Sequence, residues 1–364
     1  MMSGVRSPNS SMVNPKAMDL SIIISTRNRA QSLAKAIDAI AKLNISFDQI
    51  EIFVADNGSS DSTPIVSQMY ANIFPHFKYI FDPRPGQLIG WHRALFESNG
   101  EILAFIDDDV RPTPDWAKCV LESFESPEIG IATGQIIPEF EERPPSWQKD
   151  MVLENNLGIW SALWGMLDFG TKIKEIPVDF VWGSNFLIRR KVMLEAGGFH
   201  PGGMPKELFH FTGDGDVGVG RIVAETGLKA LYHPGAAVAH DLPANRNSSA
   251  NEVKRWIFGE GLVTSYVLMR RLATANSTLT GTNLIDLAED TISSTEISNI
   301  GRGYLNAESK LSDELDLLFR TCGSEGFRLH QKYFKKDALF RDWVLQPNYL
   351  DLDACYTHPD LLAI

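Results

Sequence analysis

Three consecutive aspartates, Asp107, Asp108 and Asp109, are the residues of this sequence that point most directly to chemistry. They follow an apolar, strand-like run at residues 102–106. Side chains alternate along a strand, so Asp107 and Asp109 should lie on the same side, where their charges repel each other. A divalent cation would relieve that repulsion, and Mg²⁺ or Mn²⁺ bound by carboxylate oxygens could also hold a diphosphate. A solvated acidic turn is the alternative interpretation.

Two further acidic segments could contribute to a site. Residues 56–61 read Asp-Asn-Gly-Ser-Ser-Asp after another strand-like run, although these residue types also favour a capped turn. Residues 213–218 match G-x-G-x-x-G, but residues 206–212 before them do not read as the buried strand that a dinucleotide-binding turn requires. Asp214 and Asp216 would also repel a pyrophosphate. We therefore interpret Asp214 and Asp216 as acid–base candidates.

Strand-like and helix-like patterns alternate before these motifs. We expect strands near residues 20–24, 50–55, 78–81 and 102–106, and helices near residues 33–41, 63–70 and 87–98. Such repeats predict an α/β fold with a mostly parallel sheet and helices on both faces. Parallel sheets bind ligands just beyond the carboxyl ends of their strands, and two of the acidic segments lie there.

Composition narrows the class of protein. The chain has 364 residues and a formal net charge of −12, which disfavours a nucleic-acid partner. Its three cysteines, Cys119, Cys322 and Cys355, are widely spaced and predict neither a disulfide framework nor a cysteine-based zinc site. We find no apolar stretch of bilayer-spanning length and no secretory signal, so the expected location is cytoplasmic.

Three regions are expected along the chain. Residues 1–17 are rich in Ser, Asn and Pro and are predicted to form a disordered tail. Residues 18–245 carry the strand–helix repeats and the acidic motifs, and residues 246–364 are predicted to be a mainly helical appendage. Within it, residues 251–271 form a helix with an apolar stripe, which could make peripheral contact with a membrane. Burial of that stripe inside the protein is the favoured alternative.

Taken together, these motifs resemble those of glycosyltransferase family 2, over about residues 20–261. The matching segments are residues 25–29, 56–61, 106–109 with 112–116, 182–185 with 189–190 and 197–199, 212–216, and 232–234 with 240. Each is a weak signal alone, but six in the family's order are specific. The resemblance implies a GT-A fold and an inverting enzyme. Such an enzyme moves a sugar from a nucleotide-diphosphate sugar to an acceptor hydroxyl, in polysaccharide or glycoconjugate synthesis.

The resemblance also implies roles for individual residues. Nucleotide-sugar binding is expected of Thr26, Arg27, Asn28, Arg29, Asp56, Asn57, Gly58, Ser59, Arg84, Asp107 and Asp108. Acceptor binding is expected of Trp182, Gly183, Ser184 and Asn185. Asp109 and His240 are expected to bind Mn²⁺ or Mg²⁺, with a hydrogen-bonded core role as the alternative for His240. A UDP-sugar is the favoured donor, and a glycan or a lipid-linked molecule is the expected acceptor.

Asp216 is our choice for the catalytic base, with Asp214 as the alternative. The family's acidic pair usually reads Glu-Asp, whereas this loop reads Gly-Asp-Gly-Asp. A helix should begin near Asp216, so the positive end of its dipole is expected to lower the pKa of that carboxyl. Asp214 would then contact the acceptor or steady the loop. A helix cap without chemistry is the other interpretation of Asp216.

Some interpretations stay open. Aromatic residues between 138 and 177 could stack on an acceptor sugar, although a role in the core is favoured. A nicotinamide oxidoreductase would need glycines after the first strand, and residues 25–29 contain none. A sugar nucleotidyltransferase could use the aspartate triplet but would usually carry a Gly- and Lys-rich turn there. A catalytically inactive nucleotide-sugar-binding protein would not need Asp214 and Asp216.

Overall fold

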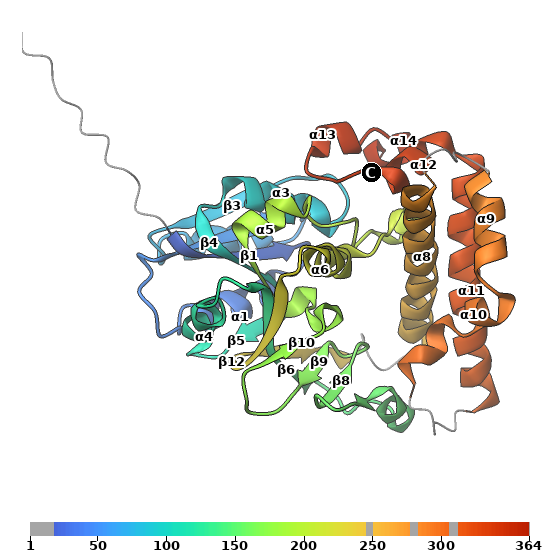
Figure 1. Cartoon of the computed structure of the whole chain (residues 1–364). Coiled ribbons are helices and arrows are strands. Elements are labelled where there is room, and N and C mark those ends of the chain that lie inside the picture. Colours follow the sequence, from blue (N-terminus) through green and yellow to red (C-terminus); the bar gives the residue numbers. More distant parts are fainter. Residues whose placement is uncertain (1–17, 245–249, 277–282, 306–311, 364) are drawn as a thin grey trace, which may run out of the picture.

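The computed structural model describes residues 18–244, 250–276, 283–305 and 312–363. The predicted tail, residues 1–17, lies outside the described residues. Figure 1 shows a twisted sheet with helices on both faces and, beside it, a separate stack of C-terminal helices.

The first half of the sheet follows the predicted alternation. Its elements are β1 (Met18–Thr26), α1 (Ala30–Ile40), β2 (Ile50–Asp56), α2 (Thr63–Tyr70), β3 (Phe77–Phe81), α3 (Gln87–Glu97) and β4 (Gly100–Asp107). The four strands are parallel in the order β3-β2-β1-β4. Every residue of β2 is buried, as expected for a parallel strand covered by helices on both faces. The predicted α/β architecture is therefore confirmed.

The second half of the sheet is mixed. Its strands are β5 (Val110–Pro112), β6 (Ile129–Phe140), β7 (Leu153–Glu154), β8 (Ile159–Ser161), β9 (Met166–Asp168), β10 (Lys174–Ile176), β11 (Phe186–Arg189) and β12 (Lys229–Leu242). β11 pairs antiparallel with both β4 and β6, whereas β12 runs parallel to β6. The sequence did not reveal these antiparallel pairings, because strand direction depends on how the irregular connections cross the sheet.

Short helices connect these strands. They are α4 (Trp116–Ser123), η1 (Ser146–Met151), η2 (Val178–Phe180), η3 (Gly183–Asn185), α5 (Arg190–Glu195), η4 (Lys206–Phe211) and α6 (Gly215–Glu225). Because η4 is a 3₁₀ helix, no strand precedes the glycine-rich residues 213–218. This bears out the interpretation that they are not a dinucleotide-binding turn.

The C-terminal region is helical, as predicted. It comprises α8 (Ala250–Ala275), α9 (Asn283–Thr291), α10 (Ser294–Ser298), η5 (Ile300–Tyr304), α11 (Asp313–Lys336), α12 (Ala338–Leu345), α13 (Leu352–Cys355) and α14 (Pro359–Leu362). α8 lies along α11 (Figure 1), and Val253, Ile257 and Leu262 are buried. Val253 and Ile257 of the apolar stripe in residues 251–271 are therefore packed inside the protein, as the favoured alternative predicts, whereas Val263 and Val267 of the same stripe are only half-buried. Within the described ranges, no helix has the length and hydropathy needed to cross a bilayer.

The end of the chain returns to the sheet. Tyr356 Oη donates a hydrogen bond to the backbone oxygen of Pro85 at 2.9 Å, and Arg84 pairs with Asp353 at 2.8 Å. Earlier in the same segment, the backbone oxygen of Tyr349 accepts a hydrogen bond from His92 on α3. Contacts from the C-terminal segment therefore hold the loop that leads into α3 in place.

His92 makes folding sensitive to acid. Its Nε2 accepts a hydrogen bond from Phe199 N–H at 2.8 Å, and its Nδ1 lies 3.0 Å from the backbone oxygen of Tyr349. Burial lowers the pKa of His92 to about 4, against the opposing effect of the Tyr349 carbonyl. A protonated ring could not accept the Phe199 hydrogen bond, so the folded state requires the neutral form.

The pKa of His92 is lower in the folded than in the unfolded chain, so protonation favours unfolding as the pH falls from about 6.5 to 4. We expect His92 alone to remove about 3 kcal/mol of stability over that range, at about 1.4 kcal/mol per pKa unit. Urea unfolding at several pH values checks this. His92→Gln should be less stable at neutral pH but should lose this part of the pH dependence. Parallel pH profiles of the two proteins would contradict the assignment.

Candidate active site

The aspartate triplet and the loop after β1 form one ionic cluster at the carboxyl edge of the sheet. Thr26 Oγ1 donates to Asp108 Oδ2 at 2.6 Å. The Arg29 guanidinium bridges Asp108 Oδ1 at 3.1 Å and Asp109 Oδ2 at 2.7 Å. Burial raises the pKa of Asp108 to about 7, against the attraction of Arg29. Arg29 thereby offsets part of the repulsion between adjacent carboxylates.

Asp107 points toward the start of α3. Its Oδ1 accepts a hydrogen bond from Gln87 Nε2 at 3.0 Å. Gln87 is the first residue of α3, and its backbone N–H donates to Gly202 at 3.1 Å. The loop before α3, which the C-terminal segment fastens, thus also positions a partner of Asp107.

The loops after β1 and β2 are joined to each other. Asn28 N–H donates to Ser59 Oγ at 2.8 Å, and Ser60 N–H donates to Asn28 Oδ1 at 2.7 Å. Asp56 Oδ1 accepts from Ser59 N–H at 2.7 Å, and Asp56 Oδ2 accepts from Tyr79 Oη at 2.7 Å. The predicted nucleotide-binding residues of both loops therefore lie together.

Other predicted nucleotide-binding residues lie at the border of this group. Asn57 Nδ2 donates to the backbone oxygen of Gly86 at 3.1 Å, while Gly58 has a φ of +81°, in the left-handed region that suits glycine. Arg27 is exposed. Arg84 stands apart, because its guanidinium contacts Asp82 at 2.7 Å and Asp353 at 2.8 Å. These two carboxylates already balance its charge.

His240, on β12, faces Asp109. Its Nδ1 lies 2.9 Å from the backbone oxygen of Trp164, which can only accept, so Nδ1 carries the proton. Its Nε2 is buried, has no hydrogen-bond partner in the part of the chain that the structure describes, and lies 3.6 Å from Asp109 Oδ1. A histidine oriented through its other ring nitrogen is the usual arrangement of a metal ligand. The nitrogen–oxygen pair fits Mn²⁺ better than Mg²⁺, which prefers oxygen ligands.

The acidic loop separates its two aspartates. α6 begins at Gly215 with Asp214 as its N-cap residue, so Asp216 is not the helix cap. Asp214 Oδ1 lies 2.5 Å from His200 Nδ1, and its Oδ2 lies 2.9 Å from Arg221. Although burial opposes it, the hydrogen bond with His200 and the charge of Arg221 hold the pKa of Asp214 below its ordinary value. Both carboxylate oxygens of Asp214 are thus engaged by cationic or polar groups.

Asp216 has a different environment. Its Oδ2 accepts a hydrogen bond from Gly183 N–H, and its Oδ1 accepts from Val217 N–H at 3.0 Å. Burial raises the pKa of Asp216 to about 6, against these two hydrogen bonds. The expectation that the helix dipole would lower this pKa was therefore wrong, because burial outweighs it. A carboxylate that binds a proton near pH 6 is a better general base than an ordinary one.

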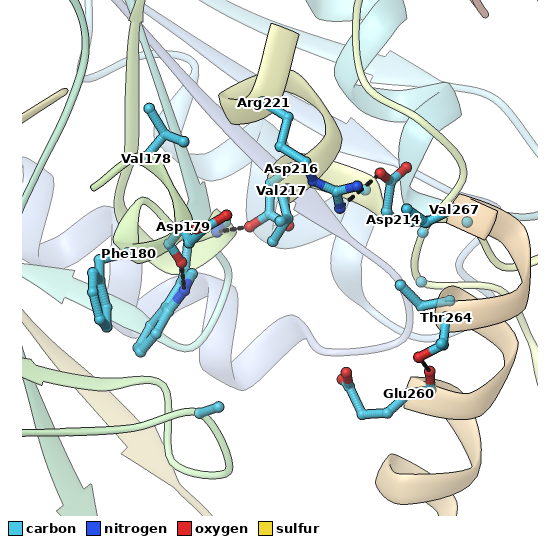
Figure 2. Close-up of a pocket in the computed structure, with 18 of the residues that line it drawn as sticks. Val178, Asp179, Phe180, Asp214, Asp216, Val217, Arg221, Glu260, Thr264 and Val267 are labelled. Atoms are coloured by element: carbon cyan, nitrogen blue, oxygen red, sulfur yellow. Dashed lines mark hydrogen bonds and ion pairs between the residues drawn. The ribbon is translucent and has the colours of Figure 1, made fainter. Parts of the chain in front are cut away.

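A cavity of about 1120 Å³ opens beside Asp216 (Figure 2). The sheet side contributes Gln87, Trp91, Asp107, Trp160, Phe180, Trp182, Gly183, Asp214, Asp216 and Arg221 to its lining. One face of α8 contributes Glu260, Val263, Thr264, Val267, Leu268 and Arg271. Aromatic rings beside carboxylates suit a polyhydroxylated ring, which has apolar faces and hydrogen-bonding edges.

The predicted acceptor residues divide into two pairs. Trp182 and Gly183 line the cavity. Ser184 and Asn185 are buried, and Asn185 hydrogen-bonds Trp116 Nε1 at 3.1 Å and the backbone oxygen of Ala236 at 2.9 Å. These contacts make Asn185 a structural link between elements. The aromatic segment also divides, since Trp164 and Phe169 are buried but Trp160 lines the cavity.

Several cavity residues were missed in the sequence. Gln87 and Arg221 could have been suspected, because each begins or lies on a helix next to a predicted motif. Glu260 and Tyr304 carry no comparable signal, because their position depends on how the C-terminal helices pack against the sheet.

Comparison with known proteins bears on this geometry. Residues 21–196 match the family model described as glycosyl transferase family 2. Just under half of the chain, residues 21–196, is therefore similar to family 2 glycosyltransferases. The resemblance inferred from the motifs is confirmed. The match ends before Asp214, so the roles of Asp214, Asp216 and His240 depend on the geometry given above.

Curated relatives of this chain are distant. The glucosyl-dolichyl phosphate glucuronosyltransferase of Haloferax volcanii is 23% identical over 228 residues, which cover 62% of this chain and 70% of the relative. The pre-mycofactocin glycosyltransferase of Mycobacterium tuberculosis is 24% identical over 232 residues, covering 62% of this chain but only 43% of that protein. Among solved structures, the mannosyltransferase PcManGT of Pyrobaculum calidifontis, in complex with GDP-Man and Mn²⁺, superposes with a TM-score of 0.49. Its sequence identity is 16%, and the superposition covers 95% of this chain and 89% of that one.

Proposed function

We propose that this chain is a metal-dependent, inverting glycosyltransferase that transfers a sugar from a nucleotide-diphosphate sugar to an acceptor hydroxyl. One observation carries the proposal: Asp216, a carboxyl whose pKa burial raises to about 6, lines the large cavity together with Asp107 of the triplet. A base and a diphosphate-side cluster in one cavity are what a single in-line displacement requires.

Some residues of the site bind the donor, and others act on the acceptor. The joined loops after β1 and β2 bind the nucleoside, and the triplet with Gln87 faces the diphosphate. Asp216 removes the proton from the acceptor hydroxyl as its oxygen forms the new bond to the anomeric carbon. The bond from that carbon to the diphosphate oxygen breaks, so the configuration inverts. Asp214, held by His200 and Arg221, keeps the base loop in place.

The donor set of Asp109 and His240 fits a divalent cation, with Mn²⁺ as the first choice. Such a cation, when bound, would offset the charge that develops on the leaving diphosphate.

The acceptor is a glycan or a lipid-linked glycoside. The Haloferax relative is named for glucosyl-dolichyl phosphate, which is a lipid-linked sugar. In this chain, the cavity pairs aromatic residues of the sheet side with Val263, Val267 and Leu268 of α8. Such a lining accepts a sugar ring attached to an apolar group. A UDP-sugar is the first choice of donor.

A thermal-shift panel tests the proposal. UDP-, GDP- and dTDP-sugars are each added to the full chain with and without Mn²⁺. A true donor at 100 times its Kd should stabilise the protein by about 2.7 kcal/mol. We expect sugars of one nucleotide class to do so only with Mn²⁺. We also expect the protein to hydrolyse that donor slowly, which releases the nucleoside diphosphate. No stabilisation by any of these compounds would reject the function. Formation of pyrophosphate from a nucleoside triphosphate and a sugar phosphate would indicate a nucleotidyltransferase instead.

A further inference from the structure

Glu260 is a carboxylate that the helical region brings to the cavity. It lies on α8 and points into the cavity from the side opposite Asp216 (Figure 2). The cavity-lining residues of α8 are spaced at 260, 263, 264, 267, 268 and 271, which is one helical face. In that face Glu260 is the acidic end, and the middle is apolar apart from Thr264.

The Glu260 side chain is held in one orientation. Tyr304 Oη, from η5, donates to Glu260 Oε2 at 2.5 Å. The Tyr304 ring packs edge-on against Trp256, with ring centroids 4.6 Å apart, which fixes the hydroxyl. Burial raises the pKa of Tyr304 well above its ordinary value, so the hydroxyl stays protonated and always donates. Among the described residues, no hydrogen bond to Oε1 occurs, and this oxygen is the one left for a ligand.

Glu260 and Asp216 also interact electrostatically across the cavity. Burial raises the pKa of Glu260; Tyr304 opposes this effect and the charge of Asp216 adds to it. Two carboxylates facing one space repel each other unless a ligand with hydrogen-bond donors lies between them. A sugar ring has several hydroxyls, so one can donate to Asp216 while another donates to Glu260.

We propose that Glu260, oriented by Tyr304, binds a second hydroxyl of a pyranoside acceptor and so selects which hydroxyl faces Asp216. This inference rests on the proposed function and extends it, because it assigns part of the acceptor site to the helical region. Trp160 and Trp182 line the same cavity and supply surfaces on which the ring can stack.

The test uses the full chain and p-nitrophenyl glycosides of glucose, galactose, mannose and glucuronic acid as acceptors, with the donor found in the thermal-shift panel. Glu260→Gln keeps the side-chain volume and can still accept from Tyr304, so a packing role would survive it. We expect its acceptor KM to rise about 10-fold, because a hydrogen bond to a charged group is lost. Donor hydrolysis without acceptor, and nucleotide binding, should change less than about twofold.

Three further variants sharpen the result. Tyr304→Phe should raise the acceptor KM by a smaller factor, about 3-fold, since Glu260 keeps its charge but loses its restraint. Glu260→Asp should recover part of the affinity. Glu325→Gln, at an exposed glutamate of α11 outside the cavity, is the matched control and should behave as wild type.

Distinct outcomes overturn this inference. An acceptor KM within twofold of wild type in Glu260→Gln removes Glu260 from acceptor binding. Equal losses of transfer and donor hydrolysis would make Glu260 a donor-side or structural residue. A wild type that hydrolyses the donor but glycosylates no p-nitrophenyl glycoside refutes the pyranoside acceptor while leaving the proposed function intact. A wild type that neither binds nor hydrolyses any sugar nucleotide rejects the proposed function itself.

Discussion

Replacing Asp216 with asparagine should lower the rate of sugar transfer by at least ~10²-fold, the lower range of general-base contributions. The asparagine side-chain oxygen can still accept the hydrogen bond from Gly183 N–H, and only the bond from Val217 N–H is lost, so we expect the variant to fold and to bind nucleotide and Mn²⁺ normally. Steady-state transfer rates together with calorimetric nucleotide binding check both parts. Normal transfer by this variant would refute the assignment of the base.

The pH profile gives an independent measure of the same residue. Because the base must be ionised and the pKa of Asp216 is about 6, wild-type kcat should decline as the pH falls below about 6. Residual transfer by Asp216→Asn should lack that acid limb. If the acid limb were caused instead by Asp108, whose pKa is about 7, it would remain in both proteins. The comparison therefore separates the two carboxyls.

Asp214→Asn is the control for the acidic loop. Asp214 is buried between His200 and Arg221, and removing its charge leaves Arg221 without its carboxylate partner. We expect this variant to have a lower free energy of unfolding than wild type. At a temperature where it is still folded, it should retain transfer activity. A folded Asp214→Asn without transfer activity, beside an active Asp216→Asn, would move the base to Asp214.

Replacing Asp109 with asparagine should abolish the part of nucleotide affinity that depends on Mn²⁺. The amide is a poor metal ligand compared with a carboxylate, whereas Arg29 keeps its contact with Asp108, so the loop after β1 should remain in place. Calorimetry of UDP and GDP binding with and without Mn²⁺ measures the effect. Equal dependence on Mn²⁺ in wild type and Asp109→Asn would show that the cation binds elsewhere.

His240→Ala resolves the two interpretations of that histidine. If His240 is a metal ligand, its removal should weaken Mn²⁺-dependent nucleotide binding and leave nucleotide binding without metal unchanged. As a core residue hydrogen-bonded to Trp164, it should lower only the stability. Unaltered Mn²⁺ affinity in His240→Ala would support the core role.

The sequence by itself determined the parallel half of the sheet and the resemblance to family 2 glycosyltransferases. The strand-like runs near residues 20–24, 50–55 and 102–106 became β1, β2 and β4, because buried parallel strands need continuous apolar residues whatever surrounds them. Since those strands are parallel, the polar residues after them necessarily meet at one edge. The contacts among Thr26, Asp108 and Arg29 follow from that rule.

Other features depended on the tertiary structure. The pKa of Asp216 rises because residues distant in sequence bury it, and a dipole argument from its own helix gave the opposite direction. Arg84 is engaged by Asp353, which is 269 residues away, and Glu260 reaches the cavity only because α8, packed against α11, forms the wall of the cavity that faces the sheet side. Local sequence patterns determine secondary structure and its edges, whereas burial and partners depend on which distant surfaces meet, and no local pattern records them.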